Sequence, residues 1–119
     1  MNVTELPADP YDRHQRAARN QSLFREVNEK IEALAHDSTV TFHEFSCECA
    51  DTHCIEVVPL TVEEYEHIRR IPTHFAVAPG HVYPDVERVV ETDGVGNRYE
   101  VVEKYGVAGL LAVELDPRS

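Results

Sequence analysis

A chain of 119 residues with 22 acidic and 11 basic side chains carries a formal charge of −11 at pH 7. Its length is that of one ordinary domain, which can bury a hydrophobic core without disulfide support. The acidic excess argues against nonspecific nucleic-acid binding, which needs a basic surface, and against attachment to an anionic membrane, so we expect neither partner.

The expected compartment is inferred from the absence of a signal peptide and of a membrane span. The N-terminal residues hold no apolar segment of the kind a signal peptide needs, and no stretch approaches the ~20 apolar residues of a membrane span. We therefore expect a cytoplasmic protein whose thiols stay reduced. Its three cysteines lie close together, and an odd, clustered set in that compartment favours metal or thiol chemistry over a structural disulfide.

The first predicted element is a long helix. Residues 1–9 are expected to form a flexible arm, after which Asp9 can cap a helix that begins at Pro10. Its apolar residues recur at helical steps and form a narrow stripe of Ala17, Phe24, Val27, Ile31 and Leu34. We expect the stripe to pack on the protein's own sheet, while a homodimer through this helix is the alternative. Arg25 and Glu29, four residues apart, are assigned to the solvent-exposed face.

The rest of the chain predicts short elements. Strands are expected at 39–45, 55–60 and 74–78, a short helix at 60–70, and a β-hairpin with strands 86–91 and 99–104 around the turn 93–97. Thr61 and Glu64 form a capping box at the start of the short helix. The fold class is therefore α+β, with one long helix, one short helix and a small, mostly antiparallel sheet.

The domain organisation follows the same pattern. Residues 10–105 are expected to form a single α+β domain, and residues 106–119 a C-terminal tail. The tail is apolar at Leu110, Leu111 and Val113, which either pack back on the core or frame a contact with a partner.

All three cysteines fall in one predicted hairpin loop with the pattern C-x-C-x4-C. Cys47 and Cys49 lie two apart at the end of a strand, so both side chains leave the same face. Cys54 begins the returning strand and closes the loop from the other side. A structural zinc site needs four soft or borderline ligands in a tetrahedron, and this loop supplies three of them.

The fourth ligand is predicted to be His81. It follows Pro79 and Gly80, which make a tight turn that can direct a side chain back at a neighbouring strand end. His43 would lie about 13 Å from Cys47 along an extended strand, too far to share an ion. His53 adjoins Cys54 and is expected to point the other way. No local signal brings the remaining histidines to the loop: His14, His36, His67 and His74.

Two other interpretations of the cysteines remain open. Reduced thiols can pack as small apolar residues, but Glu48, Asp51 and His53 indicate an exposed polar turn. A thiol switch is the second alternative, in which Cys54 would resolve an oxidised Cys47 or Cys49.

The chain also resembles a known family in several segments: "RAARNQSLFREVNEKIEAL", "FSCECADTHC", "LTVEEYEHIR", "PTHFAVAPGHVYPDVERVVE" and "YEVVEK". Together they resemble a family of small uncharacterised proteins from actinobacteria and relatives, over about residues 16 to 104. Members carry the same C-E-C-A motif and P-G-H turn, so the resemblance implies that Cys47, Cys49, Cys54 and His81 act as a unit. It implies no activity.

These observations predict a small non-catalytic zinc-binding protein. Its Cys3His site would stabilise a protein-interaction or regulatory domain whose protein partner is unidentified. A redox-sensing regulator that releases zinc on oxidation is the first alternative. A zinc enzyme is the weaker one, because the sequence has neither H-E-x-x-H nor the P-C-x-x-C of zinc deaminases.

Overall fold

The computed structural model of the chain describes residues 10–35, 40–93 and 96–118. The elements along this part of the chain are α1 (Pro10–Ala35), β1 (His43–Ser46), β2 (Val57–Leu60), α2 (Val62–Arg69), β3 (His74–Val77), β4 (Glu87–Thr92), β5 (Glu100–Lys104) and α3 (Gly106–Glu114). The α+β class is confirmed, and the predicted arm 1–9 lies outside the described residues. Within that part, no helix combines the length and apolarity needed to cross a bilayer.

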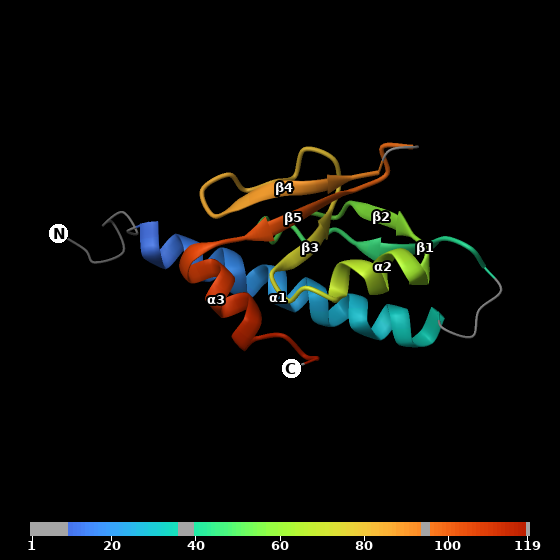
Figure 1. Cartoon of the computed structure of the whole chain (residues 1–119), viewed down its shortest axis with the longest axis horizontal. Coiled ribbons are helices and arrows are strands. Elements are labelled where there is room, and N and C mark those ends of the chain that lie inside the picture. Colours follow the sequence, from blue (N-terminus) through green and yellow to red (C-terminus); the bar gives the residue numbers. More distant parts are fainter. Residues whose placement is uncertain (1–9, 36–39, 94–95, 119) are drawn as a thin grey trace.

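The strands form two small antiparallel sheets. β1 pairs with β2 in a hairpin, and β3, β5 and β4 form a three-stranded sheet in that order. Figure 1 shows α1 running along one side of the molecule beneath the strands, with α2 and α3 lying against it. The core between these layers includes the aromatic side chains of Phe45, Tyr65 and Phe75. Phe45 and Tyr65 stack with ring centroids 4.6 Å apart, which joins the hairpin to α2.

The predicted capping box at the start of α2 is present. The Glu64 amide donates to Thr61 Oγ1 at 3.0 Å, and the Thr61 amide donates to Glu64 Oε1 at 2.9 Å. The Glu64 carboxylate also binds the Arg98 guanidinium, which holds the pKa of Glu64 below its usual range. A local sequence signal and a tertiary ion pair therefore fix the same helix end.

The inward face of α1 is polar, and the predicted stripe is only partly correct. Ala17 is buried, and Ile31 packs against the core, but Leu34 is 86% exposed. Arg25, assigned to the solvent-exposed face, is instead completely buried. It donates to the Pro72 carbonyl at 2.6 Å and to the Ala112 carbonyl at 2.7 Å. The helix turns this side inward because its long polar side chains satisfy carbonyls from distant segments.

The C-terminal tail packs back on the domain as α3. Ala108 and Ala112 are buried and Leu111 packs partly buried against the core, whereas Leu110 is 72% exposed. Gly109 allows a close approach, because a Cβ there would lie 2.9 Å from the Lys104 carbonyl oxygen. α3 thus contacts α1 directly, and Leu110 and Val113 stay on the outside.

The two faces of α1 predict unequal mutational effects. Ile31→Ala should lower the free energy of unfolding by about 2 kcal/mol, because Ile31 packs partly buried against the core. Leu34→Ala removes a similar volume from an exposed position and should change it by less than about 0.5 kcal/mol. Urea unfolding of both variants measures the difference. Equal losses would show that the exposed side of α1 is covered in solution, as in the alternative of a homodimer through this helix.

Candidate metal centre

The three cysteines lie where the β1–β2 hairpin widens into a loop. The Cys47 amide donates to the Glu56 carbonyl at 3.0 Å, so backbone pairing continues one step past β1. The Cys54 amide donates to the Asp51 carbonyl at 3.1 Å and closes the turn. Cys47 and Cys49 are buried, and Cys54 is half-buried. All three are free thiols held at one end of the hairpin.

His81 reaches this loop through the turn that follows β3. The Glu48 amide donates to the Ala76 carbonyl at 2.8 Å, which places β3 beside the cysteine segment. The chain then turns at Gly80, whose φ of 84° favours glycine, and the His81 amide donates to the Ala78 carbonyl at 3.0 Å. The imidazole is thereby directed at the thiols, as the sequence predicts.

The four side chains form one compact cluster. His81 Nδ1 lies 3.6 Å from Cys47 Sγ and 3.6 Å from Cys54 Sγ. With Cys49 Sγ included, the ligand atoms all lie within 4.8 Å of one another. Tetrahedral zinc with its usual bond lengths would place sulfur and nitrogen about 3.6 Å apart and two sulfurs about 3.8 Å apart. These residues therefore lie within metal-binding distance of one another.

Other histidines have different contacts. His74 Nε2 lies 3.0 Å from Glu103 Oε2, and His67 Nε2 lies 3.2 Å from Glu91 Oε1. His14 Nε2 lies 3.7 Å from Asp85. His43 and His53 also lie outside the cluster, and His53 is exposed. His36 falls outside the described residues. The structure brings only His81 among the described histidines to the three thiols.

The closeness of the thiols separates their pKa values. A hydrogen bond from Cys47 lowers the pKa of Cys49 to about 5, and His81 contributes to the lowering. The same hydrogen bond, together with burial, raises the pKa of Cys47. Burial raises the pKa of Cys54. The Ala78 amide also donates to Cys47 Sγ at 3.2 Å, a contact that stabilises sulfur as a thiolate when a cation displaces its proton.

Glu48, between the first two cysteines, is a second residue, after Arg25, that the structure places differently from the prediction. It was expected in an exposed polar turn but is completely buried. Since successive residues of an extended segment point to opposite sides, Glu48 points into the core while its neighbours face the cluster. Its carboxylate accepts hydrogen bonds from Asn28 Nδ2 at 2.8 Å, the Tyr65 hydroxyl at 2.9 Å and the Ala76 amide at 2.9 Å.

The side chains of α1 complete this support. Gln21 Nε2 donates to the Glu48 carbonyl at 2.9 Å. Asn28 Nδ2 donates to the Ser46 carbonyl at 2.7 Å, and Asn28 Oδ1 accepts from the Ser46 amide at 2.8 Å. Gln21, Arg25 and Asn28 follow one another at steps of four and three along α1, which is the signal in the sequence that they share one helix face. These contacts fix the backbone of the segment that carries Cys47 and Cys49.

Fold and cluster together define an α+β protein with a candidate Cys3His metal centre. Comparison of the chain with protein-family models, with curated proteins and with solved structures gives no match. The resemblance to an actinobacterial family stays a prediction.

Proposed function

We propose that this chain is a small zinc-binding protein in which Cys47, Cys49, Cys54 and His81 hold one Zn²⁺. The observation that carries the proposal is the convergence of three thiols and one imidazole within 4.8 Å, from two segments joined only through the fold. Thiolates with imidazole are ligands that suit zinc, whereas calcium and magnesium prefer oxygen.

A structural role suits this centre better than catalysis. Four protein ligands complete a tetrahedron and leave no open position for water or substrate. The two carboxylates within the cysteine loop are also engaged elsewhere: Glu48 accepts three hydrogen bonds inside the core, and Asp51 Oδ1 accepts from the His53 amide at 2.9 Å. A hydrolytic enzyme would need a carboxylate free to act as a base beside the metal.

The metal would connect the β1–β2 hairpin to the turn after β3 and leave other surfaces for a protein partner. Leu23, Val27 and Leu34 project from the outer face of α1, where they are 60%, 47% and 86% exposed. Exposed apolar side chains along one helix suit recognition of another protein or a second copy of this chain. These features support an interaction or regulatory domain held in shape by zinc.

A redox-sensing role is the second candidate, favoured by the position of Cys54. This thiol is half-buried at the rim of the cluster, so an oxidant can reach it more easily than its two buried neighbours. Oxidation of zinc-bound thiolates would release the metal. Peroxide that releases zinc reversibly supports the sensor, and zinc that resists peroxide supports a purely structural site.

The proposal predicts one zinc ion per chain. Protein purified under reducing conditions should contain zinc at a 1:1 ratio by elemental analysis, and a chelator should lower its thermal midpoint, because metal binding adds to folding free energy. Cys49→Ser measured in the same way is the matched variant. Reduced protein that contains no zinc, and gains no stability when zinc is added, would contradict the proposal.

Zinc affinity should also fall as the pH is lowered. The pKa values of Cys47 and Cys54 are raised, so both thiols are protonated at pH 7, whereas Cys49, with a pKa of about 5, is already a thiolate. Zinc must then displace about two protons, and its affinity should rise about 100-fold per pH unit between pH 7 and 8. Chelator competition at several pH values measures the slope, and a flat profile would contradict it.

A further inference from the structure

A groove runs between α1 and the cysteine loop. One hollow, of about 410 Å³, is lined by Arg16, Ala17, Asn20, Ala50, Asp51 and Tyr83. A second, of about 270 Å³, shares Ala50, Asp51 and Tyr83 with the first and extends to Cys49 and His81. The two hollows therefore form one continuous groove that begins at α1 and ends at the metal centre.

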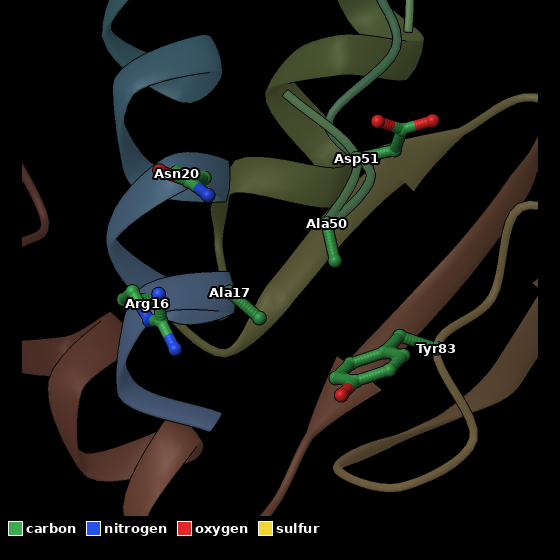
Figure 2. Close-up of a pocket in the computed structure, with 6 residues that line it drawn as sticks. All are labelled: Arg16, Ala17, Asn20, Ala50, Asp51 and Tyr83. Atoms are coloured by element: carbon green, nitrogen blue, oxygen red, sulfur yellow. The ribbon is translucent and has the colours of Figure 1, made fainter. Parts of the chain in front are cut away.

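The walls of the groove are apolar in the middle. Figure 2 shows the methyl groups of Ala17 and Ala50 pointing into the space, with the Tyr83 ring extending toward α1 on the other side. The Asp51 carboxylate points away from this space, and its Oδ1 accepts a hydrogen bond from the His53 amide at 2.9 Å. The negative charge on the rim is thus directed out of the groove.

Two polar side chains on the wall of the groove can donate hydrogen bonds into it. Arg16 and Asn20 make no side-chain hydrogen bond or ion pair with any other described residue, and both line the hollow. Other arginines of this acidic chain are paired: Arg88 with Glu103 at 2.9 Å, and Arg118 with Glu66 at 2.7 Å. Arg19, Lys30 and Arg70 likewise have no carboxylate partner among the described residues, so what distinguishes Arg16 is its position in the wall of the hollow.

We propose that this groove binds a small organic carboxylate with a compact apolar body. The guanidinium of Arg16 would take the carboxylate in a two-point contact, and Asn20 and the Tyr83 hydroxyl would add further donors. The methyl groups of Ala17 and Ala50 and the Tyr83 ring would contact the apolar body. This site goes beyond the structural zinc centre, and its anion contact does not require the metal.

Benzoate is a suitable probe because it combines these two features. Titrated into the zinc-loaded protein, it should shift the amide NMR signals of Asn20, Ala50 and Tyr83 and saturate with a Kd of about 1–10 mM, as expected for so small a ligand. Benzamide has the same shape without the charge and should bind at least about 10-fold more weakly.

Two variants decide whether Arg16 is the anchor. Arg16→Gln should weaken benzoate binding at least about 10-fold, while Arg19→Gln, at a neighbouring exposed position outside the groove, should leave it unchanged. Both replacements are on the surface and preserve the fold. The proposal is overturned if benzoate gives no saturable shift up to about 20 mM, if benzamide binds equally well, or if Arg16→Gln binds like the unaltered protein. If the protein holds no zinc and still binds benzoate, the result contradicts the proposed metal centre and leaves the proposed groove site standing.

Discussion

Replacing His81 by alanine should weaken zinc binding by at least about 10–100-fold, the loss that even indirect changes around a metal cause, and should lower the thermal midpoint. The reason lies in how the cluster is built. Three of the candidate ligands come from one hairpin loop, and His81 alone comes from the turn after β3. Without its imidazole the metal would keep three thiolates but lose the only coordinate bond between the two segments.

Two histidines near the loop provide the control. His53 adjoins Cys54 and is exposed, and His43 lies at the start of β1, so neither alanine variant should change zinc affinity by a comparable factor. Competition with a chromophoric chelator measures all three variants on one scale. If His81→Ala keeps full affinity and His53→Ala or His43→Ala loses it, the metal centre is real but its fourth ligand is a different residue.

The parts of the fold that could be predicted from sequence have local causes. The capping box of Thr61 and Glu64 marks the start of α2 because its two hydrogen bonds involve residues three apart. The turn at Gly80 is equally local, since a φ of 84° favours glycine. Such a turn can direct the His81 side chain back toward a neighbouring strand, and the structure places its Nδ1 3.6 Å from two thiols.

The parts that could not be predicted depend on partners far away in the chain. Arg25 is buried because the carbonyls of Pro72 and Ala112, 47 and 87 residues away, need donors. A hydrophobic stripe cannot reveal such partners, because it treats every polar residue as solvent-exposed. The packing of the C-terminal helix is hard to predict for a similar reason: its fully buried residues Ala108 and Ala112 are small and carry little hydrophobic signal.

The second large effect should come from Glu48, although it is not a ligand. Glu48→Ala is expected to lower the free energy of unfolding by about 3–5 kcal/mol and to weaken zinc binding as well. The change would leave the Asn28 amide, the Tyr65 hydroxyl and the Ala76 amide without their acceptor inside the core. Arg69, whose charge favours the Glu48 carboxylate, would also lose an opposite charge nearby.

The variant Glu48→Gln has nearly the same shape as the native side chain but no charge, so it separates the two contributions. Glu48→Gln keeps one oxygen but places an NH2 group where the carboxylate had its second acceptor. Three donors converge on that carboxylate, so at least one of them would then face another donor. The free energy of unfolding of Glu48→Gln should therefore lie between those of the unaltered protein and Glu48→Ala. Glu44, exposed on β1, is the matched control, and its alanine variant should change stability by less than about 0.5 kcal/mol.

Urea unfolding with and without chelator, together with zinc competition, tests this role. If Glu48 holds Cys47 and Cys49 in place, Glu48→Ala should lose stability in the metal-free form too, because its contacts lie on the side of the segment opposite the thiols. Its zinc affinity should then fall because part of the binding free energy is needed to order a loosened loop. A Glu48→Ala variant as stable as Glu44→Ala would show that the buried carboxylate does not support the metal centre.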